Sequence, residues 1–193
     1  EDENAKCLDG SFGAYYISDS GRNSSKIMLF FEGGGWCGDS DLATTLESCY
    51  QRSKTDLGAQ LNTLNFDIGD GILSNDPANY FKDFTKIFIK YCDGSGHQGT
   101  KSNPIQYKET KLYFRGSNLT ISKLNHLEKT LGLSQKQLVL VTGISAGGLA
   151  AFTWVDYIRN KTASKNVYAV PDSGVFLDFP ILIQRKTNTR YGS

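Results

Sequence analysis

The chain has 193 residues, and 39% of them are hydrophobic. Its 21 basic and 20 acidic residues leave a formal net charge of +1 and form no long run of either sign, so there is no electrostatic case for a nucleic-acid partner or an anionic membrane surface. No apolar stretch approaches the ~20 residues of a membrane span. The length predicts a single domain with a sizeable core.

The first third of the chain contains two predicted strands, over residues 12–17 and 27–31. The second run is apolar without alternation, which is typical of a strand in a parallel sheet that is covered on both faces. It leads directly into the glycine-rich segment 32–37. From residue 41 to about residue 64 the sequence is polar, with a weak helical pattern.

The middle of the chain contains two further predicted strands and a helix. Residues 86–91 alternate as in a strand and are followed by a glycine-rich loop over 93–99, and a short strand is predicted over 112–114. Gly132 is expected to end the amphipathic helix that comes next, because glycine readily adopts the left-handed conformation found after helices. The apolar face of this helix is formed by Ile121, Leu124, Leu127 and Leu131.

The last part of the chain repeats the alternation of strand and helix. Four consecutive apolar residues over 138–141 predict a buried strand, and the pattern over 147–159 predicts a helix that is apolar on almost every face and therefore buried. A further strand is expected over 167–170, ended by Pro171. This order predicts an α/β fold with a mostly parallel sheet and helices on both faces. No repeat or linker divides residues 1–193.

Residues Gly143–Gly147 form a GxSxG sequence between a predicted strand and a predicted helix. A serine hydroxyl becomes a nucleophile when a sharp turn lifts it out of the sheet edge and points it at a base. Glycines beside the serine supply the room and the φ freedom for such a turn. The context favours a nucleophile elbow with Ser145 as the nucleophile, and a plain connection between a strand and a helix is the alternative.

A second glycine-rich segment, Gly33–Gly35, follows the strand over 27–31, where esterases carry their oxyanion loop. Without side chains, its backbone N–H groups can approach a substrate oxygen closely, and the N–H of Ala146 completes the set. A flexible turn or a phosphate loop is the alternative. No lysine follows at the position that a nucleotide P-loop requires, which disfavours a nucleotide-binding module.

The four cysteines include no CxxC arrangement, so metal-ligand spacing is absent and disulfide bonds are the leading interpretation. Four cysteines allow three pairings, and buried free thiols are the alternative. Sequons at Asn23, Asn118 and Asn160 are candidate N-glycosylation sites. Together these features favour a secreted or extracellular protein, or one in the secretory lumen.

Six segments resemble, in the same order, motifs of the pectin acetylesterase/Notum family. They are Cys7–Ser11, Glu32–Cys37, Tyr91–Gly94, Phe114–Gly116, Gly143–Gly148 and Asp172–Asp178. The resemblance implies an α/β-hydrolase fold and a secreted serine carboxylesterase. Plant and microbial members remove O-acetyl groups from polysaccharide, and Notum removes a lipid acyl group from a signalling protein. The chain corresponds to roughly the N-terminal half of that family.

The resemblance implies roles for individual residues. Ser145 would be the nucleophile, and the backbone N–H groups of Gly34, Gly35 and Ala146 would form the oxyanion hole. Trp36 would lie close to the substrate pocket, although packing beneath the loop is the alternative.

Two disulfide bonds are also implied by the resemblance, Cys37–Cys49 and Cys7–Cys92. His97, in the glycine-rich loop over 93–99, is a candidate substrate contact at the border of the pocket. It does not stand where the family's catalytic base stands.

The chain departs from the family in its histidines. Both of them, His97 and His126, precede Ser145, whereas the order in such hydrolases is serine, acid, histidine. We therefore expect residues 1–193 to be an incomplete α/β-hydrolase domain, with the triad aspartate and histidine in a C-terminal remainder of the same protein. Losing a triad base lowers turnover on the order of a million-fold, so this chain alone would be nearly inert.

Two functions are therefore considered. The first is a secreted serine carboxylesterase that removes O-acyl groups, above all O-acetyl, from carbohydrate or another ester substrate, with no cofactor and no metal. The second is a catalytically incomplete family member that acts as a structural or carbohydrate-binding component of an extracellular assembly. The intact elbow and the glycine loop favour the enzyme, and the missing base favours the second function.

Overall fold

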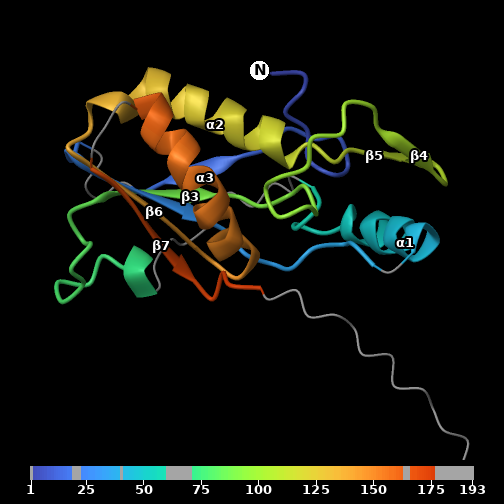
Figure 1. Cartoon of the computed structure of the whole chain (residues 1–193), viewed down its shortest axis with the longest axis horizontal. Coiled ribbons are helices and arrows are strands. Elements are labelled where there is room, and N and C mark those ends of the chain that lie inside the picture. Colours follow the sequence, from blue (N-terminus) through green and yellow to red (C-terminus); the bar gives the residue numbers. More distant parts are fainter. Residues whose placement is uncertain (1, 19–22, 40, 60–70, 163–165, 177–193) are drawn as a thin grey trace, which may run out of the picture.

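The computed structural model describes residues 2–18, 23–39, 41–59, 71–162 and 166–176 (Figure 1). Short 3₁₀ helices are labelled η. In chain order the elements are β1 (Tyr15–Ile17), β2 (Lys26–Phe31), α1 (Leu42–Arg52), η1 (Gly71–Leu73), β3 (Thr85–Ile89), β4 (Ile105–Tyr107), β5 (Thr110–Leu112), α2 (Gly116–Leu131), η2 (Leu133–Gln135), β6 (Leu138–Ile144), α3 (Ala146–Thr162) and β7 (Val167–Asp172).

The main sheet has five strands in the order β1-β3-β2-β6-β7. Strand β3 is parallel to β2, β2 to β6 and β6 to β7, whereas β1 runs antiparallel to β3. The helix α2 connects β3 to β6, and α3 connects β6 to β7, as parallel strands require. This arrangement confirms the predicted α/β fold class, and it brings the carboxyl ends of β2, β3, β6 and β7 to one edge of the sheet.

Both long helices cover the same face of the sheet (Figure 1). Leu124 of α2 and Trp154 of α3 belong to one buried cluster with Leu29 at the centre of the sheet. On the opposite face, the cover among the described residues is η1 and the segment before β3, which contribute Leu73 and Phe84. The sequence predicted helices on both faces. Among the described residues, the face opposite α2 and α3 carries only the short 3₁₀ helix η1.

The helix α1 stands beside the sheet and packs against the small β4–β5 hairpin and the N-terminal segment (Figure 1). Its first turn is capped by Asp41, whose carboxylate accepts a hydrogen bond from the Thr44 N–H at 2.9 Å. Tyr50 of α1 is buried in a cluster with Leu8 and Leu112. The weak helical pattern that began at residue 41 therefore forms a helix that ends at Arg52.

Three details differ from the expectations. Strand β7 continues through Pro171 to Asp172, because it is the outer strand of the described sheet and an outer strand tolerates the missing N–H of proline. The outer face of α3 is not buried, and Phe152 on it is 48% exposed. The β4–β5 hairpin was not expected in full, because its strands have three residues each and little periodicity.

Both disulfide bonds that the resemblance implied are present. Cys7–Cys92 joins the N-terminal segment to the residues that follow β3, across 85 positions of sequence. Cys37–Cys49 joins the end of the glycine loop to α1, across 12 positions. All four cysteines are paired.

Candidate active site

Ser145 lies between the last residue of β6 and the first residue of α3. Its φ is +57°, in the left-handed region that residues with a side chain rarely adopt. Two backbone hydrogen bonds fix this turn, from the Ser145 N–H to the Asp172 carbonyl and from the Leu149 N–H to the Ser145 carbonyl, both at 3.0 Å. A half-buried serine on a strained turn between a strand and a helix has the geometry of a nucleophile elbow.

The elbow packs directly against the end of β2, and its glycines allow this approach. Phe31, the last residue of β2, pairs in register with Gly143. A Cβ atom on Gly147 would collide with the carbonyl of Phe31 and lie 2.8 Å from that of Glu32. Both obstacles are backbone atoms, which cannot turn aside as the end of a side chain can. A side chain at position 147 would therefore force the elbow away from the end of β2.

The glycine loop follows β2 at this same edge. Gly34 has a φ of +136° and Gly35 a φ of +62°, conformations that favour glycine. Within the described residues, neither of their N–H groups donates a backbone hydrogen bond. The N–H of Ala146, the first residue of α3, has no acceptor inside the helix. Three N–H groups are thereby available where β2 and β6 end.

Charged side chains, namely the half-buried Glu32 and the buried Lys90 and Lys123, support the backbone under this loop. Glu32 Oε1 lies 2.7 Å from Lys90 Nζ, and its Oε2 accepts a hydrogen bond from the Tyr91 N–H at 2.7 Å. Burial raises the pKa of Glu32, and the hydrogen bond from Lys90 opposes the rise. Burial also lowers the pKa of Lys123 to about 8, and the amine donates to the Lys90 carbonyl at 2.7 Å.

His97 lies beneath the glycine loop and is only 2% exposed. Its ring stacks on Tyr91 with 4.6 Å between centroids, and its backbone carbonyl accepts a hydrogen bond from Trp154 Nε1 at 3.1 Å. Burial lowers the pKa of His97 to about 4, so the imidazole is neutral at pH 7. The ring is therefore packed inside the protein. The contact between His97 and substrate stays a prediction, and the burial of the ring does not support it.

Trp36 is 47% exposed at the end of the glycine loop. Its ring meets Phe176 edge to face, with 5.1 Å between centroids, so residues that follow β7 reach the same edge of the sheet. The pair offers an exposed aromatic surface next to the loop. Of the sequon residues, Asn23 and Asn160 are exposed, and Asn118 is half-buried in the first turn of α2.

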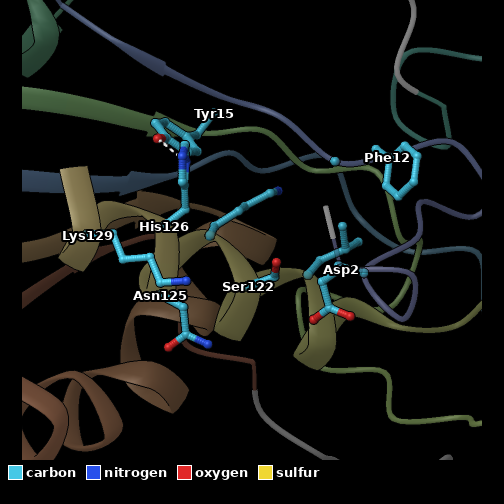
Figure 2. A pocket seen from close by; sticks show the side chains of 11 residues that line it. Asp2, Phe12, Tyr15, Ser122, Asn125, His126 and Lys129 are labelled. Atoms are coloured by element: carbon cyan, nitrogen blue, oxygen red, sulfur yellow. Dashed lines mark hydrogen bonds between the residues drawn. The ribbon is translucent and has the colours of Figure 1, made fainter.

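A separate pocket of about 550 Å³ lies between the N-terminal segment, β1 and α2 (Figure 2). Tyr15 and His126 meet there, with 2.7 Å between the phenol oxygen and Nδ1. None of the site residues predicted from the sequence lines it. Among the described residues, no group of three His, Cys, Asp or Glu side chains is placed to hold a metal ion, and no helix has both the length and the hydropathy to cross a membrane.

Comparison with known proteins identifies the family of the chain. A family model described as pectinacetylesterase matches residues 1–193. The chain belongs to the pectinacetylesterase family. Pectin acetylesterase 5 of Arabidopsis thaliana is 34% identical over 195 residues, which cover 97% of this chain and 43% of that protein. Palmitoleoyl-protein carboxylesterase NOTUM of Homo sapiens is 30% identical over 181 residues, covering 89% of this chain and 34% of its own length.

The chain thus spans less than half the length of these relatives. Within it, the structure brings the elbow and the glycine loop to one edge of the sheet, and the sequence predicted that they act together. The side chains of Arg52, Tyr91 and the neutral His97 bond to backbone carbonyls in and next to that loop. The sequence analysis did not predict this role for any of them. Their contacts cross 18, 56 and 65 positions of sequence, so no local pattern could have revealed them.

Proposed function

We propose that this chain carries the nucleophile and the oxyanion hole of a secreted serine carboxylesterase that removes O-acyl groups. The observation that carries the proposal is Ser145, held at a φ of +57° between β6 and α3, at the sheet edge where Gly33 closely approaches the carbonyl of Ile144. The pectin acetylesterases and NOTUM proteins among its relatives support an ester-cleaving reaction. The two disulfide bonds support a location in an oxidising, extracellular compartment.

In the proposed reaction, Ser145 Oγ attacks the carbonyl carbon of the ester and its proton passes to a histidine base. The carbonyl oxygen becomes an oxyanion, which accepts hydrogen bonds from the N–H groups of Gly34, Gly35 and Ala146. Collapse expels the alcohol, which takes up the proton, and leaves an acyl-serine. Water then attacks the acyl-serine through the same steps, releasing the carboxylic acid and regenerating Ser145.

We further propose that the base and its aspartate partner lie in a C-terminal remainder of the protein. Neither histidine of this chain fits the role, because His97 is buried under the glycine loop and His126 lies between α2 and β1, bonded to Tyr15. The relatives are more than twice as long as the matched segment, which leaves room for both residues after residue 193.

The proposed substrate is an acetylated carbohydrate. Four relatives named pectin acetylesterase are 33–35% identical to this chain, whereas four named NOTUM or notum2 are 29–30% identical. The exposed ring of Trp36, which Phe176 meets edge to face, supplies an aromatic surface beside the loop that is suited to the C–H face of a sugar ring.

A fluorophosphonate probe tests the proposal on the protein with its C-terminal remainder. We expect the probe to label Ser145 covalently and the Ser145→Ala variant to stay unlabelled. Hydrolysis of p-nitrophenyl acetate, butyrate and laurate then measures the acyl preference, and release of acetate from acetylated pectin measures the alcohol preference. Folded protein that takes up no label would contradict the esterase.

The second function remains a non-catalytic component of an extracellular assembly that binds carbohydrate. One observation favours it, namely that no histidine follows Ser145 in this chain. Under this function, the folded protein with its remainder would take up no probe, would hydrolyse none of the esters, and would still bind a pectin fragment in calorimetry.

A further inference from the structure

Three side chains from distant parts of the sequence each hold one backbone carbonyl in the segment from Glu32 to Gly35, which contains the glycine loop. His97 Nε2 lies 2.9 Å from the Glu32 carbonyl, Arg52 Nη2 donates to the Gly34 carbonyl at 2.8 Å, and the Tyr91 hydroxyl donates to the Gly35 carbonyl at 2.8 Å. We call Arg52, Tyr91 and His97 the loop anchors.

A held carbonyl fixes the direction of the N–H in the same peptide unit. The described chain has no cis peptide bond, and in a trans peptide the C=O and the next residue's N–H point to opposite sides. The bond from Arg52 to the Gly34 carbonyl therefore turns the Gly35 N–H away from Arg52. The bond from Tyr91 to the Gly35 carbonyl fixes the peptide on the other side of Gly35.

The hydrogen positions on the anchors are determined by their surroundings. The Tyr91 hydroxyl accepts a hydrogen bond from the Gly96 N–H at 2.8 Å, so its own hydrogen is left for the Gly35 carbonyl. Burial raises the pKa of Tyr91, which keeps that hydrogen in place. The imidazole of His97 is neutral, and its hydrogen must lie on Nε2 to bond with the Glu32 carbonyl.

The anchors also support one another. The Arg52 guanidinium lies 4.9 Å from the centroid of the Tyr91 ring, and its Nε donates to the Leu57 carbonyl at 3.2 Å. On the far side, Tyr91 stacks on His97, and His97 meets Phe31 of β2 edge to face at 5.2 Å. The three anchors thus form a continuous stack that ends on β2, the strand from which the glycine loop starts.

We propose that Arg52, Tyr91 and His97 are positioning residues that hold the backbone from Glu32 to Gly35, on both sides of the peptide between Gly33 and Gly34, in the conformation that presents the N–H groups of Gly34 and Gly35 to the oxyanion. Glycine at these two positions has wide conformational freedom, and nothing in its own structure keeps φ at +136° and +62°. The anchors supply that restraint from outside the loop. This inference rests on the proposed function, since an oxyanion exists only if Ser145 attacks an ester.

The first test measures hydrolysis of p-nitrophenyl acetate by the protein with its C-terminal remainder. Tyr91→Phe removes one hydroxyl, and Arg52→Lys keeps the charge but changes the donor geometry. Because one oxyanion donor contributes roughly 10²–10³-fold to kcat, we expect Tyr91→Phe to lower kcat by about 10- to 100-fold with KM within about twofold. Arg52→Lys should retain more activity than Arg52→Met.

The matched control is Tyr15→Phe, which also removes one phenol hydroxyl, in this case one that lies against His126 Nδ1 in the pocket of Figure 2. It should leave kcat and KM unchanged. Equal loss of kcat in Tyr15→Phe and Tyr91→Phe, or a rise in KM without loss of kcat, would overturn the positioning role.

A second readout does not depend on activity. In ¹⁵N-glycine spectra of the same protein, Tyr91→Phe and Arg52→Lys should shift the amide signals of Gly34 and Gly35, and Tyr15→Phe should not. If the wild type cleaves no ester while these signals move, the esterase proposal fails and the anchoring of the loop stands. If the wild type is active while signals and kcat stay unchanged in both variants, the anchors are overturned and the esterase stands.

Discussion

The backbone of Ser145 is strained, and this strain is a local property that stability measurements can detect. A residue with a Cβ atom at left-handed φ is disfavoured by roughly 1–2 kcal/mol, whereas glycine is not. The structure holds φ at +57° through hydrogen bonds to Asp172 and from Leu149, which lie on both sides of the turn. The nucleophile thus occupies a position that backbone energetics would give to glycine.

We predict that Ser145→Gly is more stable than Ser145→Ala by about 1 kcal/mol, because only alanine keeps the strained Cβ. Both variants lack the nucleophile and should be inactive. At Ser122, in the ordinary helix α2, the order should reverse, with alanine more stable by about 1 kcal/mol. Urea unfolding of the four variants measures both differences. Alanine more stable than glycine at both positions would mean that Ser145 is not strained.

His97 should make folding sensitive to acid. Its pKa is about 4 in the folded protein because burial disfavours the charged ring, against an ordinary value of 6.5. Below pH 6.5 the unfolded chain therefore binds a proton that the folded chain does not, so the free energy of unfolding falls as the pH falls. The loss is complete near pH 4 and amounts to about 3 kcal/mol. The Asp93 carboxylate favours the charged ring and the nearby Lys123 opposes it.

This prediction is checked by chemical denaturation at pH 7, 5.5 and 4. His97→Gln cannot take up a proton but keeps a donor for the Glu32 carbonyl. Between pH 7 and pH 4, its free energy of unfolding should therefore fall by about 3 kcal/mol less than that of the wild type. The exposed Asn125 of α2 provides the control, and Asn125→Gln, which changes no titratable group, should keep the pH dependence of the wild type. Parallel curves for His97→Gln and the wild type would contradict the buried neutral ring.

At the scale of elements, patterns within one segment predicted the fold well. The apolar runs that became β2 and β6 and the amphipathic pattern that became α2 indicate burial directly, and Gly132 ends α2 at a left-handed φ of +59° as expected. The sheet order, the β4–β5 hairpin and the exposed outer face of α3 depend on neighbours far along the chain. No local pattern contains that information.

The candidate site divides in the same way. Ser145 and the glycine loop are encoded by short motifs, because each needs a particular backbone conformation over a few residues. The loop anchors Arg52 and Tyr91 reach the loop only because α1 and the residues after β3 fold against it. Tyr91 did fall within a segment that resembled the family, but the resemblance did not state what its hydroxyl contacts.

The two disulfide bonds should contribute differently to stability and to activity. On the chain-entropy account, the 85-position closure of Cys7–Cys92 contributes about 4.5 kcal/mol and the 12-position closure of Cys37–Cys49 about 3 kcal/mol. Cys37 stands two positions after Gly35, so the shorter closure restrains the oxyanion loop itself. We predict that replacing both cysteines of the shorter closure by alanine costs less stability but more esterase activity than replacing Cys7 and Cys92.

Thermal unfolding and the rate of fluorophosphonate labelling, measured on both double variants, check this prediction. Each variant serves as the control for the other. If the variant that lacks Cys7–Cys92 loses more stability and also labels more slowly, then the shorter disulfide does not position the loop.

At the scale of the whole molecule, apolar side chains are exposed on one side of the sheet. On β7, Tyr168 and Val170 are each 56% exposed, and they point away from the face that α2 and α3 cover. Beyond β7, Val175 is 69% exposed. Within the described residues, β7 pairs with β6 alone, so its outer edge has no neighbour. The relatives are more than twice as long as the matched segment.

We therefore predict that a C-terminal remainder packs on β7 and buries Tyr168 and Val170. In the protein with its remainder, changing both residues to lysine should lower the free energy of unfolding by at least about 3 kcal/mol, since each loses a buried apolar side chain. In residues 1–193 alone, the same change should reduce aggregation and the binding of a hydrophobic dye, because an exposed apolar patch is replaced by charge. Tyr80, 84% exposed near η1, is the control, and Tyr80→Lys should alter neither protein. A longer protein that tolerates both lysines without loss of stability would mean that this surface faces solvent in the complete molecule.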